Sequence, residues 1–310
     1  QIGASLTTST DVLGRSFASS AVVGTGANDK LTTINLTSFA VELEPLRNVI
    51  FRLGGNYRTL ESASPTFSLD YNTPNGIESS IEQYETTLSM SYFPKRKMTG
   101  FGVERREAND DFARVFAQIS RGDKSIFNSD FNYTKLQMSY IQPMQVGGFG
   151  RLTTTVEAGE TFGEVPLGLL SVIPGNQTYL SIYNTFSQLD FYEFVSDTYV
   201  SVHLEHNFNG RFFSRIPFLR KLNLREIVSF RAVIGDVSQE NIDLSNVPSN
   251  PNNLQLLAPN KKPYYEYSFG VGNIFKIFRI DFNFRGNYLD EVNYPDVRKF
   301  GITGSFGFHF

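Results

Sequence analysis

The sequence predicts an all-β protein, in which one transmembrane antiparallel β-barrel of roughly twelve to sixteen strands takes up the whole chain. Three observations support this fold class. Many segments of about ten residues alternate between apolar and polar side chains, as strands between lipid and a polar lumen do. Short and long connections largely alternate toward the C-terminus. No apolar run approaches the ~20 residues of a membrane-spanning helix.

The alternating segments follow one another along the chain, and each is expected to form a strand. They are Leu31–Leu43, Val49–Arg58, Gln83–Tyr92, Met98–Glu107, Asp111–Ser120, Asn132–Gln142, Gly150–Phe162, Thr198–Phe208, Leu222–Gly235, Tyr265–Val271, Lys276–Tyr288 and Phe300–Phe310. In the clearest, Lys276–Tyr288, large apolar residues at even positions oppose charged and polar residues at odd positions. In Leu31–Leu43 the apolar positions change phase near Ser38, and we expect a β-bulge there.

The last segment carries a large apolar residue at every second position except Gly304. Bacterial outer-membrane β-barrels commonly end in such a strand with a terminal Phe, and this segment resembles theirs. The resemblance implies a bacterial outer-membrane location, contact with outer-membrane lipid, and a C-terminal barrel signal made of Phe306, Phe308 and Phe310.

The connections predict the two ends of the barrel. Short connections resemble periplasmic turns and long ones resemble extracellular loops. The short ones include Pro94–Lys97 and Asn273–Phe275, and the long ones are Leu60–Ser80, Gly163–Thr198 and Asp236–Pro263. We expect a single barrel domain over residues 1–310, with residues 1–30 as an N-terminal extension or an extra strand.

Residues 163–198, which we name the lid loop, are long but rich in apolar side chains. A solvated loop would not carry them, and this composition argues against disorder. The loop is therefore expected either to fold into the lumen as a plug or lid, or to bind a partner. Its candidate functional residues are Gly175, Asn176, Thr178, Tyr179, Glu193 and Asp197.

Charged residues lie on the polar faces of several predicted strands, where they would line the lumen. One interpretation is that they pair with one another and only stabilise the barrel; the other is that they form a constriction that sets ion selectivity. The candidates are Arg225, Arg231, Arg279, Asp281 and Arg285.

The composition excludes several kinds of chemistry. The chain has 28 Lys and Arg against 31 Asp and Glu, and this balance argues against nucleic acid as the main partner. It has no Cys, which excludes thiol chemistry. Of the three His, His203 and His206 would face opposite sides of a strand, so we expect no metal site. No catalytic or phosphate-binding motif emerges, and we expect neither an enzyme nor a cofactor.

Part of the chain resembles a known family. The runs that carry the resemblance are Phe162–Pro166, Pro174–Tyr179, Phe191–Asp197, Glu205–Gly210 and Ile216–Leu222 with Arg225-Glu226. They are similar to a Bacteroidota outer-membrane barrel family of unknown function, over about residues 45–310. Long members of that family carry an N-terminal carboxypeptidase-regulatory-like domain, which this chain lacks, so we expect a short member or the barrel alone.

The same region more distantly resembles the barrel-assembly and two-partner-secretion transporter superfamily. There, a loop with a Val-Arg-Gly-Phe/Tyr motif folds into the lumen, whereas this chain has Gly175–Tyr179 in the comparable place and no Arg-Gly pair. We expect no periplasmic polypeptide-transport domain before the barrel.

These observations leave several functions open. The first is a non-enzymatic barrel that is a subunit of an envelope complex, with other envelope proteins or lipoproteins as partners, or an assembly or translocation barrel closed by its internal loop. A small-solute channel is an alternative, as is a soluble β-sandwich that binds carbohydrate or protein. A membrane-embedded hydrolase would need a Ser, His and acid cluster at the rim.

Overall fold

A computed structural model describes residues 2–5, 32–63, 67–101, 105–246, 258–260, 262–289 and 297–307. Its main element is a twelve-stranded sheet with the order β1-β2-β3-β6-β9-β10-β11-β14-β15-β16-β17-β18. Every neighbouring pair in this sheet is antiparallel. The strands are β1 (Ile2–Ser5), β2 (Thr32–Leu46), β3 (Val49–Ser62), β6 (Ser80–Tyr92), β9 (Arg114–Gly122), β10 (Tyr133–Gln145), β11 (Arg151–Phe162), β14 (Thr198–Asn207), β15 (Arg225–Asp236), β16 (Tyr264–Ile274), β17 (Phe278–Arg285) and β18 (Phe300–Phe306).

Smaller elements lie in the connections. They are the hairpins β4–β5 (Tyr71–Thr73, Gly76–Glu78) and β7–β8 (Met98–Thr99, Arg106–Glu107), the pair β12 and β13 (Ser171–Val172, Val195–Ser196), the helices α1 (Pro217–Arg220) and α2 (Gln239–Leu244), and the short 3₁₀ turns Gly147–Phe149, Leu167–Leu169 and Phe213–Arg215. In the described segments, no helix is long and apolar enough to cross a membrane.

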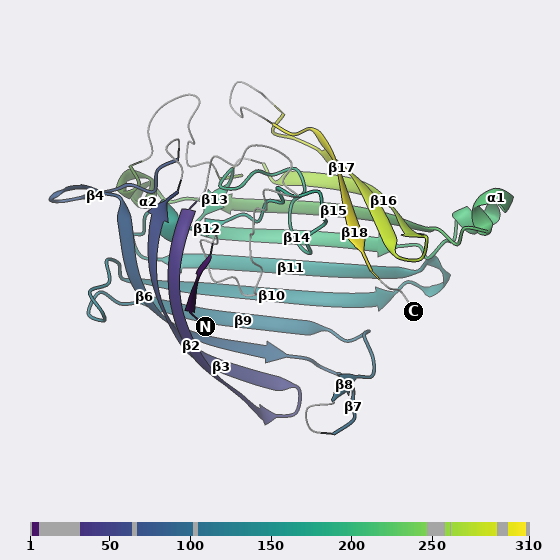
Figure 1. Cartoon of the computed structure of the whole chain (residues 1–310), viewed down its shortest axis with the longest axis horizontal. Coiled ribbons are helices and arrows are strands. Elements are labelled where there is room, and N and C mark those ends of the chain that lie inside the picture. Colours follow the sequence, from purple (N-terminus) through teal and green to yellow (C-terminus); the bar gives the residue numbers. More distant parts are fainter. Residues whose placement is uncertain are drawn as a thin grey trace.

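The sheet curls around a lumen, with its middle strands forming the far wall and its first and last strands on the near side (Figure 1). Because the order follows the chain, the connections alternate between two rims. The turn rim holds residues 47–48, 93–113, 146–150, 208–224 and 275–277, and the loop rim holds the connections after β3, β9, β11, β15 and β17. The predicted alternation of short and long connections is therefore only partly correct, since two turn-rim connections are long.

The two faces of the sheet are the reverse of those in a water-soluble sandwich. Polar and charged side chains of the strands are buried on the inner face, among them Gln83, Lys135 and Glu266. Large apolar side chains of the same strands are exposed on the outer face: Phe39, Val41, Leu53, Leu88, Met138, Tyr140, Val200, Phe230, Ile234, Tyr267, Phe269, Ile280, Phe282, Ile302 and Phe306 belong to this apolar belt. An outer apolar belt around a polar interior is the pattern of a barrel in lipid, as the sequence predicted.

The predicted bulge at Ser38 is wrong. β2 pairs with β3 in continuous register from Thr32 to Leu43, and the irregularity lies between Leu43 and Leu46. The apolar positions change phase because the apolar side chains of β2 move from one face of the strand to the other: Ile34 faces the lumen and packs in an apolar cluster there, whereas Phe39 faces outward and is 66% exposed. A periodicity that counts only apolar residues cannot distinguish a β-bulge from a regular strand that carries apolar residues first on its lumen face and then on its lipid face.

The predicted strand Met98–Glu107 is also wrong. This segment supplies only the β7–β8 hairpin outside the main sheet. β6 pairs with β3 on one edge and with β9 on the other, so no strand can insert between β6 and β9. The twelfth strand of the sheet is instead β1, which pairs with β2. The remaining predicted N-terminal positions, residues 6–30, lie outside the described residues.

β18 is the last strand of the described sheet, as the sequence predicted, and it pairs with β17 over its whole length. Phe306 is on its outer face, whereas Phe308 and Phe310 lie outside the described residues. On its other edge, the Gly304 N–H donates to the Tyr179 carbonyl at 2.8 Å and the Ser181 N–H donates to the Gly304 carbonyl at 2.8 Å. Part of the lid loop thus covers the described edge of β18.

Candidate functional site: the lid loop and the inner wall

The lid loop lies inside the lumen and packs against opposite parts of the inner wall. Its first half buries Val165, Leu167, Leu169 and Leu170 in one cluster with side chains of β2, β3, β6 and β10, namely Ile34, Leu60, Ile81 and Tyr133. Further along the loop, Ile173, Phe186, Leu189 and Phe194 are buried in another cluster with Tyr199, Val233 and Tyr264 of β14, β15 and β16. Apolar burial on two walls gives the loop a defined position.

A buried carboxylate on the wall holds the backbone of the loop. Glu266 of β16 is fully buried, and its two carboxylate oxygens accept the N–H groups of Ser187 and Gln188 at 2.8 Å each. The Tyr264 hydroxyl donates to the same carboxylate at 2.6 Å. The Arg231 guanidinium lies 3.8 Å from it and donates to the Ser187 hydroxyl at 3.0 Å. Hydrogen bonds to an ionised group are stronger than neutral ones, so this is a main attachment of the loop.

Cationic side chains attach the loop at further points. Arg285 of β17 forms an ion pair with Glu193 at 2.7 Å and lies over the Tyr264 ring at 5.0 Å from its centroid. Lys135 of β10 donates to the Leu169 carbonyl at 3.0 Å. Arg298, between β17 and β18, donates to the Leu189 carbonyl at 2.9 Å and pairs with Asp190 at 3.1 Å. These contacts come from β10 on one wall and from β17 and the connection that follows it on the other.

A second connection closes over the first half of the loop. Asp197 accepts the Ser238 N–H at 2.7 Å and the Asn241 amide at 3.0 Å, which ties the end of the lid loop to α2. Asn241 in turn accepts the Val165 N–H at 2.8 Å, and the Ser245 hydroxyl accepts the Leu167 N–H at 2.9 Å. The lid loop and the connection after β15 therefore form one packed layer at the loop rim.

The other predicted lid residues shape the loop itself. A Cβ at Gly175 would lie 2.5 Å from the Leu189 carbonyl oxygen, so only glycine permits this close approach of two backbone segments. The Asn176 side chain accepts both the N–H and the hydroxyl of Thr178 at 2.9 Å, and both residues are buried. Tyr179 is exposed and contributes only its backbone to the contact with β18.

Below the lid loop, toward the turn rim, a cavity of about 230 Å³ remains. Arg279 lines it and pairs with Glu205 at 2.7 Å and with Asp281 at 2.8 Å. Four of the five predicted lumen charges, Arg231, Arg279, Asp281 and Arg285, thus lie together along the inner face of β15–β17. Arg225 does not join them, because it begins β15 at the turn rim and lines a different cavity there.

Sequence reasoning missed Glu266 and Lys135 as attachment residues. Both were detectable only as polar residues on the inner face of their strands, a property that many residues share. The same holds for the network at the opposite wall, where the Tyr133 hydroxyl donates to Glu85 at 2.6 Å and Arg58 lies 3.4 Å from the same carboxylate. Among the described residues, no group of three or more His, Cys, Asp and Glu could hold a metal ion.

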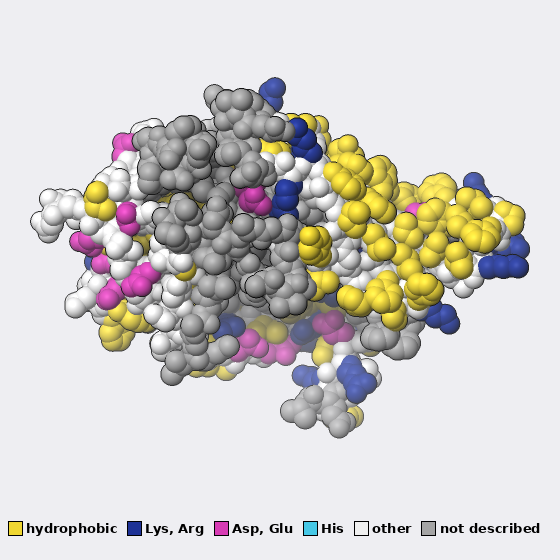
Figure 2. All heavy atoms as spheres, turned by 45° about the horizontal axis from the view of Figure 1, so that its top comes forward, with side chains coloured by type: hydrophobic (Ala, Val, Ile, Leu, Met, Phe, Trp, Pro, Cys, Tyr) yellow, Lys and Arg dark blue, Asp and Glu magenta, His cyan; other side chains and the backbone are white. Residues whose placement is uncertain are grey.

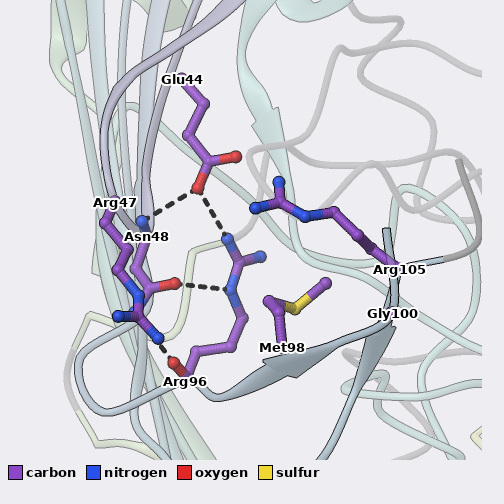
Figure 3. Close-up of a pocket in the computed structure, with 7 residues that line it drawn as sticks. All are labelled: Glu44, Arg47, Asn48, Arg96, Met98, Gly100 and Arg105. Atoms are coloured by element: carbon purple, nitrogen blue, oxygen red, sulfur yellow. Dashed lines mark hydrogen bonds and ion pairs between the residues drawn. The ribbon is translucent and has the colours of Figure 1, made fainter. Parts of the chain in front are cut away.

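A separate polar cavity of about 440 Å³ lies at the turn rim, between the β2–β3 turn and the β7–β8 hairpin (Figure 3). Arg96 donates there to Asn48 at 3.1 Å and to Glu44 at 3.2 Å, and Arg47 and Arg105 also line the cavity. Because Glu44 neutralises Arg96 and also accepts the Asn48 N–H at 2.9 Å, these contacts brace the turn. We assign this cavity no ligand.

Solved structures resemble this fold. The crystal structure of BamA from Haemophilus ducreyi lacking POTRA domains 1–3 aligns with a TM-score of 0.50 and 14% identity, over 90% of this chain and 55% of that chain. This chain therefore spans about half the length of that structure, and the likeness concerns the fold alone. OccAB3 from Acinetobacter baumannii aligns with 12% identity over 89% of this chain and 67% of its own, but the TM-score of 0.32 carries no weight. A search of curated proteins gave no match.

A family model matches the chain over residues 55–241. The matched segment runs from β3 into α2 and includes the complete lid loop together with Ser238 and Asn241, which bind it. The model describes the C-terminal domain of a family of unknown function. The chain belongs to this family, DUF5686, through that C-terminal domain.

Proposed function

We propose that this protein is a non-enzymatic integral β-barrel of the bacterial outer membrane whose lumen is closed by the lid loop. In this proposal it serves as a subunit of an envelope complex, or as a barrel of the assembly or translocation type. The observation that supports it best is the attachment of one apolar loop to opposite walls of the lumen, through Glu266, Arg285 and Lys135.

A closed lumen argues against a permanently open porin. A loop that only narrowed an aqueous pore would gain little from two fully buried apolar clusters. The outer apolar belt and the terminal strand support an outer-membrane location, and the fold likeness to BamA fits it. Other envelope proteins or lipoproteins are the partners that such a barrel would serve.

A small-solute channel is the second candidate, and the charged cavity below the lid loop favours it. Arg279, Glu205 and Asp281 would line the path of an ion once the loop had moved. The two candidates differ in whether the loop leaves the lumen under native conditions.

Planar-bilayer recording with purified protein separates them. We expect almost no steady conductance from the native chain, and clear conductance after residues 165–195 are replaced by a short Gly-Ser linker. A heat-modifiable band on a detergent gel, with different mobility before and after boiling, serves as the check that both proteins are folded. Steady conductance of the native chain would refute the closed barrel and support the channel. For a channel, we also expect no stable partner protein to co-purify from outer-membrane fractions.

A further inference from the structure

The turn-rim connection between β14 and β15, residues 208–224, projects from the barrel beside the apolar belt. We name it the rim extension; it contains α1 (Figure 1). Four of its large apolar side chains are exposed, namely Phe212, Ile216, Phe218 and Leu222, and Phe218 is 76% exposed. Figure 2 shows this apolar surface running from the barrel along the extension, with basic side chains near its tip.

The composition of the rim extension is that of an interfacial segment. It contains Arg211, Arg215, Arg220 and Lys221 but no acidic residue. Aromatic and aliphatic side chains beside Arg and Lys are typical of segments that lie at the boundary between lipid headgroups and acyl chains. In water, an exposed surface of this kind would be unfavourable, whereas at the edge of the belt it would continue the lipid contact.

The extension is fixed to the barrel rather than loosely attached. The Glu226 carboxylate of β15 accepts the Phe213 N–H, and the Phe208 N–H donates to the Glu226 carbonyl at 2.9 Å. Arg211 donates to the Gly148 carbonyl at 2.7 Å and lies over the Phe149 ring at 4.2 Å from its centroid. The exposed side chains are therefore held in one place relative to the belt.

A polar cavity of about 450 Å³ lies between the extension and the β16–β17 turn. It is lined by the cations Arg220, Arg225 and Lys276, together with the neutral side chains of Ser214, Asn223 and Asn273. In the described part of the chain, none of these three cations forms an ion pair, and no acidic residue lines the cavity. The exposed Phe275, from the β16–β17 turn, belongs to the same region.

We propose that this cavity binds the phosphate headgroup of an anionic phospholipid in the leaflet at the turn rim, while Phe218 and its apolar neighbours lie among the upper acyl chains. Positive charge in a cavity next to an apolar surface matches a molecule with a phosphate at one end and hydrocarbon at the other. The inference rests on the membrane barrel of the proposed function. It is independent of whether the lid loop closes the lumen.

The chain has no Trp, so Phe218→Trp introduces a single tryptophan at the surface in question, which can be excited selectively at a wavelength that does not excite the tyrosines. In vesicles containing phospholipid brominated on the acyl chains, we expect strong quenching of this Trp. Tyr183→Trp, an exposed position of the lid loop, serves as the control and should be quenched little. Equal quenching of both, or of neither, would refute the position of the extension in the bilayer.

Headgroup binding is tested in the Phe218→Trp protein in detergent by titrating phosphatidylglycerol. Replacing Arg220, Arg225 and Lys276 by Gln should weaken binding on the order of a hundredfold, because each cation near an anionic lipid contributes on the order of a fivefold effect. A matched triple variant at the loop rim, in Arg121, Lys124 and Lys262, removes the same charge and should bind as the parent protein does.

Three outcomes would overturn the headgroup site: equal weakening in both triple variants, equal affinity for zwitterionic phosphatidylethanolamine, or complete displacement of the lipid by inorganic phosphate. The last would indicate a free-phosphate site. Heat-modifiable mobility shows for each variant that the barrel is folded. If the headgroup site is overturned but the native barrel does not conduct in planar bilayers, the proposed function still stands.

Discussion

Glu266→Gln tests whether the wall carboxylate keeps the lid loop in the lumen. The native carboxylate accepts three hydrogen bonds, from the Ser187 and Gln188 N–H groups and the Tyr264 hydroxyl. A glutamine at this position has one acceptor oxygen and one NH₂ group. One of the two loop N–H groups would then face another donor in a fully buried environment.

The size of the effect follows from these contacts. A hydrogen bond to a charged group contributes about 1.5–3 kcal/mol, and a buried unsatisfied donor costs about 1–3 kcal/mol. Because the Arg231 guanidinium also loses its nearby carboxylate, we expect the closed loop to lose about 3 kcal/mol. Since 1.4 kcal/mol corresponds to a factor of ten, the open fraction should rise on the order of a hundredfold.

Hydrogen–deuterium exchange measures this at the affected amides. Peptides that contain residues 185–190 should exchange on the order of a hundredfold faster in Glu266→Gln than in the native chain, provided that exchange occurs through loop opening. Planar bilayers should show more frequent conductance steps in the same variant. Glu160→Gln, at an exposed position of β11, is the control. Unchanged exchange in residues 185–190 would show that Glu266 does not hold the loop.

Three further changes test the faces, the ion pairs and the rims. Phe282→Arg on the apolar belt should destabilise the barrel by about 2–4 kcal/mol in urea titrations if it lies near mid-membrane. The control, Leu289→Arg, lies beyond β17 and should have little effect. Equal losses of unfolding free energy in both variants would mean that the faces are misassigned. Arg285→Met should destabilise the barrel by about 3 kcal/mol, the lower end of the range for breaking a buried pair, because Glu193 of the lid loop loses its guanidinium partner while its side chain is only 13% exposed; an unchanged urea midpoint would contradict this. The Arg151 guanidinium hydrogen-bonds to Asp110 and lowers the pKa of that carboxyl below its ordinary value of 3.8. Stability from this pair is therefore present above about pH 3.8 and is lost as the pH falls through the lowered pKa. Asp110→Asn should abolish this part of the acid dependence of unfolding, which is small because both groups are partly exposed.

The structure changes one expectation about Asp281. From the alternation alone, Asp281→Asn on the lumen side should cost far less than a charge on the lipid side. Asp281 is buried, however, and pairs with Arg279 at 2.8 Å. Removing its charge leaves Arg279 with Glu205 alone, so Asp281→Asn should itself destabilise the barrel.

The strands could largely be predicted because alternation is a local property. In Lys276–Tyr288 the apolar side chains at even positions and the polar ones at odd positions assign both faces without any knowledge of the neighbours, and the structure has Phe282 outside and Asp281 inside. The lid loop could be singled out for a similar reason, since its apolar content is incompatible with a solvated loop.

The errors occurred where a neighbour in space decides the outcome. Ile34 of β2 is an apolar residue at an inward-facing position, where the lid loop, more than a hundred residues later in the chain, offers it an apolar surface. Met98–Glu107 forms no strand of the main sheet because β6 and β9 already occupy each other's edges. Neither fact is visible in the segment itself.

The sequence by itself therefore determined the fold class, the order of the main strands, the outward position of the apolar belt and the unusual character of residues 163–198. Only the tertiary structure decided that Glu266 and Lys135 hold the loop, that Arg225 lies apart from the other lumen charges, and that an unpaired cationic cavity lies beneath the rim extension. The physical reason is range. Alternation is set by bonds between successive residues. The Glu266 carboxylate, in contrast, meets the Gln188 backbone N–H, 78 positions away in the chain, at 2.8 Å only after the sheet has curled.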